Sequence, residues 1–337
     1  MRVMHLLTKN IGNSHKKTIL TSKLKPTIKQ VLISRPNHRL GNQLLLTPLV
    51  QEVIHTFPDC KIDLFVKGGV ANLVFQNHQH VEHIIQLPRK PFSNLFKYII
   101  CWYKLKKQDY DLVINGDKNS SSGRLSTQVA KAPYKVFGDT DDILQAKFDD
   151  HDHIAKYPVY QLRNYLKTLG FPENNNPIPT LNIKLSDDEI NNGKVILKDI
   201  VKNDKPTICI YTNATGNKIY DEAWWAPFYE RLKSDFSKYN VIELLPIENI
   251  SKINFKAPTF YSKDVREMCG LLANTAVFIA PDNGVMHLAS AAQIPVVGFF
   301  KVTSLEKYQP YGNKSMAFNT NQTNLNDWLK GIRNILE

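Results

Sequence analysis

The chain has 337 residues and a formal net charge of +12, and 42% of its residues are hydrophobic and 22% charged. This length suits two domains of about 150 residues each, and the composition is typical of a globular protein rather than a disordered or fibrous one. No run reaches the roughly 18–20 apolar residues of a membrane span, the segment up to Gln30 lacks the apolar core of a secretory signal, and the cysteines fit neither a zinc spacing nor a disulfide framework, so we expect a cytoplasmic protein.

The N-terminal segment is strongly basic. Between Met1 and Gln51 there is no Asp or Glu, against nine Lys or Arg residues. Such a segment favours an anionic partner, which can be nucleic acid, anionic lipid or a phosphorylated glycan.

The first half of the chain alternates strand and helix patterns. A loop and a helix that runs to about Thr56 follow the first predicted strand. Strands are predicted at Gln30–Arg35, Lys61–Lys67, His83–Leu87, Tyr110–Asn115 and Tyr134–Phe137.

The segment Phe92–Gln108 predicts an amphipathic helix that is both aromatic and basic. Its large apolar residues recur at helical spacing, and lysines are interspersed at Lys97, Lys104, Lys106 and Lys107. Two interpretations stay open. The helix can lie in a membrane interface, with Phe96 and Trp102 in contact with lipid, or it can face the core with a solvated basic edge.

Loop residues concentrate in Phe171–Pro179, the best candidate for an interdomain linker, and the alternation then starts again. Helices are predicted at Ala223–Ser237 and Asp264–Asn274. Strands are predicted at Thr207–Tyr211, Val241–Leu245, Ala276–Ala280 and Pro295–Phe300.

This pattern predicts an α/β fold with two Rossmann-like domains, residues 1–175 and 180–337. Ligands of such sheets bind beyond the carboxyl ends of the strands. We therefore expect a binding cleft between the two domains.

The turn Ala280–Gly284 follows a buried strand and opens an Ala-rich helix. Backbone N–H groups of Asn283, Gly284 and Val285, together with the helix dipole, predict a phosphate site, and Gly284 allows an anion to approach closely. His287 adds a donor or a positive charge. The alternative is an ordinary strand–helix connection in which Asp282 caps the helix.

Two segments together resemble glycosyltransferase family 9, which includes the ADP-heptose:lipopolysaccharide heptosyltransferases. The segment Arg35–Pro48 is similar to the N-terminal signature of that family, and Pro281–Ala289 is similar to its second signature, Asp-Thr-Gly-x-x-His-Leu-Ala. The resemblance implies the GT-B fold and an inverting, metal-independent transfer of a sugar from a nucleotide sugar, with ADP-heptose as the first candidate for that donor. The acceptor it implies is a lipopolysaccharide-type or other cell-envelope glycan, bound by Arg35, His38, Arg39 and Gly41.

A weaker similarity adds residues to the predicted donor site. The segment Tyr211–Lys218, followed by Trp224-Trp225, resembles a strand end of the family at which hydroxyl groups and a lysine contact phosphate. The resemblance thus implies that Thr212, Asn213, Lys218 and Glu248 bind the nucleotide sugar, with Asp282, Asn283, Gly284, Val285 and His287. Thr212 and Lys218 can equally be ordinary turn and surface residues, and Glu248 a surface carboxylate.

One position departs from the family. Asn42 stands where the heptosyltransferases carry the Asp that acts as general base, and an amide cannot accept the acceptor proton near neutral pH. Another carboxylate, for which Asp117 is the candidate, can act instead. Otherwise the acceptor is acidic enough, or catalysis rests on positioning and leaving-group stabilisation, or the protein binds without turnover. We favour an active transferase.

Other classes fit less well. A nucleic-acid-binding module would explain the net charge, but no zinc spacing or nucleic-acid-binding motif accompanies it. A nicotinamide-dependent dehydrogenase should show Gly-x-Gly-x-x-Gly after the first strand, where only Gly41 is present. A catalytically silent relative stays open. We expect no cofactor or metal, no nucleic-acid partner, and a peripheral location at the inner face of a bacterial inner membrane, next to an anionic lipid-linked glycan.

Overall fold

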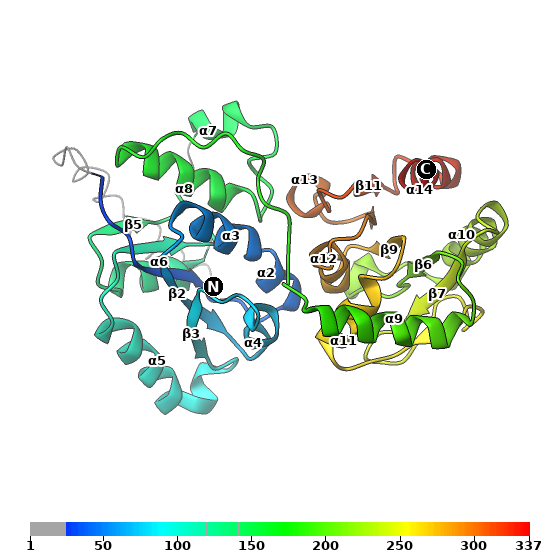
Figure 1. Ribbon diagram of the computed structural model, residues 1–337, viewed down its shortest axis with the longest axis horizontal. Coiled ribbons are helices and arrows are strands. Elements are labelled where there is room, and N and C mark those ends of the chain that lie inside the picture. Colours follow the sequence, from blue (N-terminus) through cyan, green and yellow to red (C-terminus); the bar gives the residue numbers. More distant parts are fainter. Residues whose placement is uncertain (1–24, 119, 140–141) are drawn as a thin grey trace. The chain divides into compact units, whose positions relative to one another are not determined.

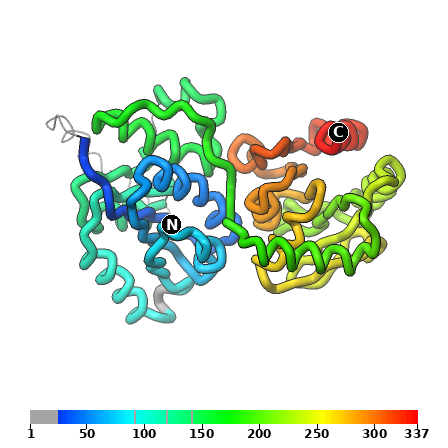
Figure 2. The backbone as a smooth tube through the Cα atoms, viewed as in Figure 1, coloured from blue at the N-terminus to red at the C-terminus, as the bar shows by residue number. Residues whose placement is uncertain are grey.

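The computed structural model describes residues 25–118, 120–139 and 142–337. The chain divides into two compact units, Met1–Pro179 (unit 1) and Thr180–Glu337 (unit 2). Residues 1–24 of the predicted basic segment lie outside the described residues, which begin at Lys25. Figure 1 shows the described elements in sequence colours, and Figure 2 follows the backbone from unit 1 into unit 2 through one green segment.

Unit 1 contains a five-stranded sheet in the order β3-β2-β1-β4-β5, with every neighbouring pair parallel. Its strands are β1 (Gln30–Arg35), β2 (Lys61–Lys67), β3 (Val81–Leu87), β4 (Leu112–Asn115) and β5 (Tyr134–Val136). Its helices are α2 (Leu40–Leu44), α3 (Thr47–Thr56), α4 (Val70–Phe75), α5 (Leu95–Lys107), α6 (Ser121–Val129), α7 (Asp142–Lys147) and α8 (Tyr157–Thr168), with the 3₁₀ turn η2 (Pro91–Asn94).

Unit 2 contains a six-stranded parallel sheet in the order β11-β10-β9-β6-β7-β8. Its strands are β6 (Thr207–Ile210), β7 (Asn240–Leu244), β8 (Thr259–Phe260), β9 (Val277–Pro281), β10 (Val296–Phe300) and β11 (Met316–Asn319). Its helices are α9 (Asp187–Val201), α10 (Glu222–Asp235), α11 (Val265–Leu272), α12 (Gly284–Ala291), α13 (Leu305–Tyr308) and α14 (Leu325–Leu336), with the 3₁₀ turn η3 (Gly216–Lys218).

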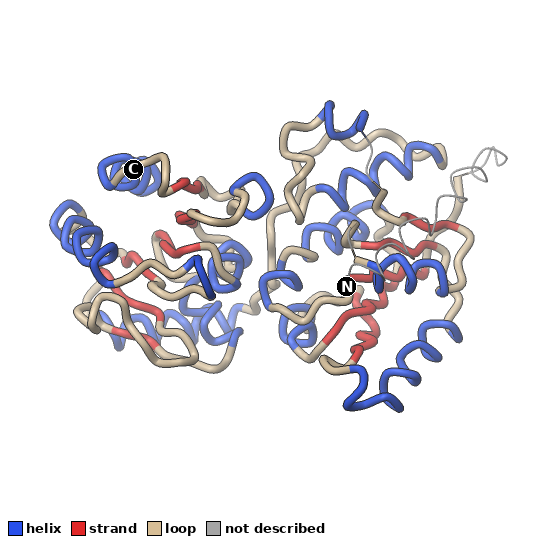
Figure 3. Tube along the Cα trace, turned by 180° about the vertical axis from the view of Figure 1, so that it is seen from behind, coloured by secondary structure: helices blue, strands red, loops and turns tan. Residues whose placement is uncertain are grey.

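Helices lie on both faces of each sheet, as Figure 3 shows. The central strands are therefore buried on both sides, and this explains why they are apolar runs rather than alternating patterns. In β1, Val31, Leu32 and Ile33 have no exposed surface, and in β9 the same holds for Val277–Ala280.

Two helices of unit 2 approach unusually closely. A Cβ atom added to Gly193 in α9 would lie 2.0 Å from the carbonyl carbon of Gly270 in α11. Only residues without a side chain allow this contact. The pair thus lets α9 pack directly against α11.

Both sheets place a topological switch point beside their first strand. In unit 1 the chain leaves β1 toward β2 on one side and returns to β4 on the other, and in unit 2 the strands β6 and β9 hold the corresponding places. Ligands of open parallel sheets bind at the carboxyl ends of these two strands. The segments after β1, β4, β6 and β9 carry most of the predicted site residues.

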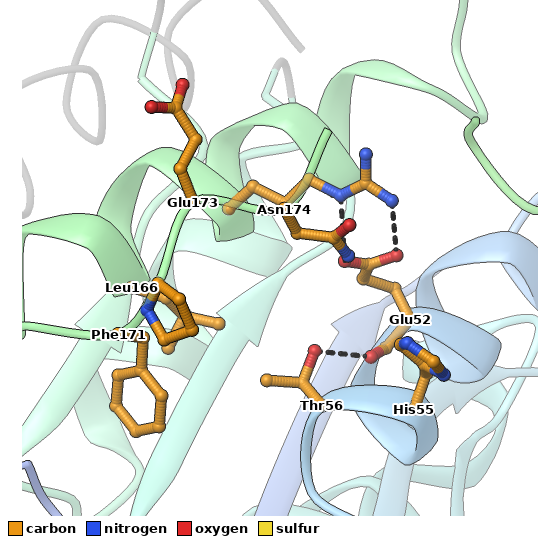
Figure 4. Close-up of a pocket in the computed structure, with 9 residues that line it drawn as sticks. Glu52, His55, Thr56, Leu166, Phe171, Glu173 and Asn174 are labelled. Atoms are coloured by element: carbon orange, nitrogen blue, oxygen red, sulfur yellow. Dashed lines mark hydrogen bonds and ion pairs between the residues drawn. The ribbon is translucent and has the colours of Figure 1, made fainter. Parts of the chain in front are cut away.

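The predicted linker is anchored to unit 1. The guanidinium of Arg163 in α8 donates from Nε and Nη2 to the carboxylate of Glu52, both at 2.7 Å, and from Nη1 to the carbonyl of Asn176 at 2.6 Å. Asn174 Nδ2 also donates to Glu52, at 2.9 Å. Glu52, Arg163 and Asn174 line a cavity of about 300 Å³ together with His55, Phe171 and Glu173 (Figure 4).

Candidate functional site

The segment after β9 builds the start of α12 from an asparagine cap. Asn283 Oδ1 accepts hydrogen bonds from the backbone N–H groups of Val285 at 2.7 Å and Met286 at 2.8 Å. Its Nδ2 donates to the carbonyl of Asn213, which follows β6, at 3.1 Å. One side chain thus joins the segments after both switch-point strands. The Val285 amide is already paired, so an anion at this helix end has to share or replace the Asn283 oxygen.

Asp282 collects the polar side chains of the same edge. Its carboxylate is 4% exposed as a residue, and Oδ2 accepts from Lys218 Nζ at 3.0 Å and from the Thr303 hydroxyl. The sequence interpretation placed Asp282 as a possible helix cap, but Asn283 holds that position. Asp282 instead orients a cation and a hydroxyl beside the N-terminus of α12.

Thr212 is fully buried and its hydroxyl is in use. It donates to Glu243 Oε1 at 2.6 Å and accepts from the Lys252 backbone N–H at 3.0 Å. Glu243 also accepts from the Ser251 hydroxyl at 2.6 Å. Burial raises the pKa of Glu243, against the two hydroxyl donors, which lower it. In the described structure Thr212 therefore holds the segments after β6 and β7 together.

His287 and Glu248 differ in accessibility. His287 lies in α12 and is buried, with 5% of its surface exposed, whereas Glu248 is exposed after β7. Burial first, and then the Glu248 carboxylate, raise the pKa of the Tyr211 phenol. Glu248 therefore lies near the carboxyl end of β6, at the predicted donor edge.

In unit 1, Arg35 ends β1 and is completely buried. Its Nη2 donates to Asn42 Oδ1 at 3.2 Å and its Nη1 to the carbonyl of Leu45 at 3.5 Å, while Nε has no hydrogen-bond partner. Among the described residues Arg35 forms no ion pair. Since it has no exposed surface, Arg35 can reach an acceptor only through Asn42, whose carbonyl it holds.

A basic cluster, which we define as His38, Arg39, Lys67 and Arg89, lies at the carboxyl edge of the same sheet. A Cβ atom at Gly68, whose φ is +75°, would lie 3.2 Å from His38 Cβ and 3.5 Å from Arg89 Nε. Partial burial lowers the pKa of His38. Three neighbouring cations lower it further: Arg89, Lys67 and Arg39. His38, Arg39 and Arg89 are exposed and Lys67 is partly buried, so the cluster forms a positive surface at the ends of β1, β2 and β3.

The loop that carries His38 is fixed to α2. Gln43 Nε2 donates to the carbonyl of Asn37, and the Arg39 backbone N–H donates to Asn37 Oδ1 at 3.1 Å. Gly41 lies inside α2 and is buried. The loop is therefore held in one conformation by its own side chains.

Asp117 follows β4, the second switch-point strand of unit 1. Burial, and then the Asp117 carboxylate, raise the pKa of the buried Tyr157 phenol, whereas the Arg35 charge lowers it. Asp117 and Arg35 thus both lie near Tyr157. The Tyr157 oxygen accepts from the Lys118 backbone N–H. The structure places the candidate base at the same edge as Asn42.

Asp111 and Asp150 in unit 1 each belong to an Asp-x-Asp sequence, a spacing that can hold a metal ion, and each has protein partners. Asp111 accepts from the Lys29 and Gln30 backbone N–H groups at 2.7 and 2.9 Å. Asp150 accepts from Lys156 Nζ and the Tyr160 hydroxyl, both at 2.7 Å. Within residues 25–118, 120–139 and 142–337, no group of three or more His, Cys, Asp or Glu side chains is arranged to hold a metal ion.

Sequence reasoning missed several residues of these edges. Lys67 and Arg89 were not singled out, although Lys67 ends a predicted strand and Arg89 follows another, which is the signal that could have found them. The roles of Glu243 and Tyr157 depend on contacts between distant segments. No local sequence pattern indicates such contacts.

Comparison with known families supports the resemblance. Residues 263–331 match the family described as Glycosyltransferase family 9 (heptosyltransferase). A search of the curated proteins found no match.

Solved structures match over nearly the whole chain. A family 9 glycosyltransferase from Veillonella parvula is 13% identical, with a TM-score of 0.73 over 93% of this chain and 98% of that one. The E. coli heptosyltransferase WaaC with ADP is 18% identical, with a TM-score of 0.66 over 91% and 99%. E. coli ADP-heptose lipopolysaccharide heptosyltransferase II is 12% identical, with a TM-score of 0.63 over 92% and 98%.

These similarities confirm the predicted α/β architecture of two parallel sheets, whereas the cleft between the two units stays a prediction. The family match includes α12 and the strand after it, where the second signature lies. The chain thus resembles glycosyltransferase family 9 and has the GT-B fold, which together support its assignment as a glycosyltransferase.

Proposed function

We propose that this chain is an inverting, metal-independent glycosyltransferase. It transfers a sugar, with heptose as the first candidate, from a nucleoside diphosphate donor. The acceptor is an anionic cell-envelope glycan of the lipopolysaccharide type. The observation that carries the proposal is the pair of segments that resemble the family signatures, each at the switch point of its own sheet. The E. coli heptosyltransferase WaaC is described both with ADP and with ADP-2-deoxy-2-fluoro heptose, which supports ADP-heptose as the first donor to test.

On the donor side, unit 2 would hold the diphosphate at the N-terminus of α12. As the bond between the sugar and the diphosphate breaks, negative charge gathers on the leaving group. Lys218, oriented 3.0 Å from Asp282, and the partial positive charge of the helix end would stabilise that charge. Gly284 would let the phosphate approach the backbone.

On the acceptor side, unit 1 would bind the glycan through its basic cluster. The cluster contains two arginines and a lysine, which suit phosphate or carboxylate groups. Arg35 would act by fixing Asn42 Oδ1 at 3.2 Å, so that the Asn42 amide N–H₂ is free to donate to an acceptor oxygen.

The acceptor hydroxyl would attack the anomeric carbon on the face opposite the nucleotide. A new C–O bond forms, the bond to the diphosphate breaks, and the hydroxyl proton needs a base. We assign this role to Asp117, since it follows the neighbouring strand β4 and bears a carboxyl group, whereas the amide of Asn42 cannot accept a proton.

The expected location is the inner face of the bacterial inner membrane, where a lipid-linked acceptor would be found. Within the described residues, no helix is long and apolar enough to cross a membrane. We propose that the chain contacts this membrane from one side, as a peripheral protein.

The test is incubation of the full chain with ADP-heptose and a panel of other nucleotide sugars, together with heptose-deficient lipopolysaccharide. Released nucleotide and glycan product are both measured, with and without EDTA. We expect product of inverted anomeric configuration and unchanged activity in EDTA. Loss of activity in EDTA with recovery on addition of magnesium or manganese would overturn metal independence, and retention of configuration would overturn the mechanism.

A catalytically silent binding protein is the second candidate, favoured by Asn42 in place of a carboxylate. Calorimetry with ADP separates the two. Nucleotide binding with no product from any donor of the panel supports the silent protein, and turnover excludes it.

A further inference from the structure

Helix α5 presents two different apolar surfaces. Its inner side contributes Cys101 and Leu105, which are 5% and 0% exposed, to the core over β2 and β3. Trp102 also faces inward, with its ring centroid 5.3 Å from that of Phe65. This corrects the sequence interpretation of Trp102 as a lipid-contacting residue, because the core already covers most of its side chain.

The outer side of α5 is apolar as well, and uncovered. Phe96 is 78% exposed and Tyr103 is 65% exposed, with Leu95 and Ile99 each more than half exposed. At about 100° per residue, these four positions fall within roughly 100° of the helix circumference. Figure 1 shows α5 in cyan on the outside of unit 1. We call this surface the α5 outer face.

Positive charge surrounds the α5 outer face. Lys97, Lys104, Lys106 and Lys107 are all exposed, and the sequence from His83 to Gln108 contains no Asp or Glu. An exposed aromatic stripe rimmed by lysines matches a surface that is apolar inside and anionic outside, which is the interface of a bilayer with acidic lipids.

Helix α5 begins shortly after Arg89 of the basic cluster. It follows β3 through η2, so its N-terminal turn lies at the carboxyl edge of the sheet, where Arg89 approaches His38. The segment that carries Arg89 of the basic cluster therefore leads directly into α5.

We infer that the α5 outer face inserts into the interface of an anionic bilayer and thereby holds the basic cluster at the level of lipid headgroups. The inference rests on the proposed function in one respect only: membrane binding would serve to bring the chain to a lipid-linked acceptor. A second copy of the chain is a weaker occupant, since pairing two such faces would bring eight lysines together without a carboxylate between them.

The first experiment measures sedimentation of the full chain with vesicles. We expect binding to vesicles of phosphatidylglycerol and phosphatidylcholine in equal parts, release by high salt, and little binding to pure phosphatidylcholine. Phe96→Ser with Ile99→Ser should weaken binding roughly tenfold or more, because two exposed apolar groups lose their contact with lipid. The matched control is Ile143→Ser, an apolar residue of the same unit that is 79% exposed.

The second experiment measures depth. Phe96→Trp and Ile143→Trp proteins are compared with vesicles that contain brominated acyl chains. Quenching beyond that of the unsubstituted chain is expected only for Phe96→Trp. Lys97→Gln with Lys104→Gln should weaken vesicle binding roughly tenfold while folding and ADP affinity stay unchanged.

Three outcomes would overturn the inference. They are equal binding to neutral vesicles, equal quenching of both tryptophan variants, and a dimer in sedimentation that Phe96→Ser with Ile99→Ser dissociates. None of these readouts depends on sugar transfer. Vesicle binding without turnover would thus count against the proposed function alone, and turnover without vesicle binding against this inference alone.

Discussion

At the switch point of unit 2, the Lys218 ammonium lies 3.0 Å from the carboxylate of Asp282. At the switch point of unit 1, the buried Arg35 guanidinium lies 3.2 Å from the amide oxygen of Asn42, and no carboxylate pairs with it among the described residues. The same strand order therefore supports two electrostatic solutions. At the switch point of unit 2 the cation is paired with a carboxylate before a ligand binds, whereas at the switch point of unit 1 the Arg35 charge has no such partner among the described residues.

The largest effect is expected where unit 1 performs proton transfer. Asp117→Asn should lower kcat by roughly 10²–10⁴-fold, the usual contribution of a general base, and leave ADP affinity unchanged. Steady-state kinetics and calorimetry measure the two quantities. Asp149→Asn, an exposed carboxylate of the same unit, is the control. Full activity in Asp117→Asn would mean that this position does not handle the proton.

The second-largest effect is expected at the predicted donor site of unit 2. Lys218→Ala removes the cation near the leaving group, and Gly284→Val closes the approach to the α12 backbone. Loss of a charge-assisted contact should weaken binding of nucleoside diphosphate by roughly 10–150-fold. Calorimetry is the measurement, with Lys205→Ala as an exposed control in unit 2. Unchanged affinity in both variants would show that the donor site lies elsewhere.

Asn42→Asp tests this difference at the switch point of unit 1 directly. The new carboxylate would replace the amide beside Arg35 and form an ion pair with it. We expect Tm to rise by a few degrees and activity on an anionic acceptor to fall roughly tenfold. Thermal denaturation and kinetics give the two readouts, with Asn42→Gln as the uncharged control. A gain in activity would instead mean that position 42 works best with a carboxylate.

The smallest effect concerns His38. Since its pKa lies below the ordinary value of 6.5, the imidazole is neutral at neutral pH and gains a proton only as the pH falls through that lowered value. A bound anion favours the charged form. Affinity for inorganic sulfate, whose charge does not change in this range, should therefore rise a few-fold from about pH 7.5 to about pH 5.5. His38→Gln should abolish this rise, and an identical pH dependence in that variant would assign it to another group.

Most strands could be predicted from the sequence because burial on both faces leaves an unbroken apolar run. The predicted bounds of β1 and β2, Gln30–Arg35 and Lys61–Lys67, coincide with the structure. The helix expected over Phe92–Gln108 begins at Leu95, because Asn94 caps it and a 3₁₀ turn precedes it. The short edge strands β8 and β11 were missed, since partly buried strands of a few residues carry no strong pattern.

The site is harder to predict than the fold. A single Ser-x-x-Glu pattern at Ser186 and Glu189 marks the start of α9 and could have been found. The full burial of Arg35 and Thr212 could not, because it depends on which distant segments cover them. Contact of Arg35 and Thr212 with ligands stays a prediction. Because both side chains are buried, they would act on a ligand through neighbouring residues.

The anchored linker has a mechanical consequence. Arg163 holds the chain to unit 1 as far as Asn176, and the Thr180 hydroxyl donates to Gln293 of unit 2 at 3.2 Å. Only residues 177–179 lie between these attachments, and two of the three are proline, whose φ is fixed by its ring. The stretch between the two attachments is thus short and has few rotatable backbone bonds, unlike a flexible glycine-rich linker.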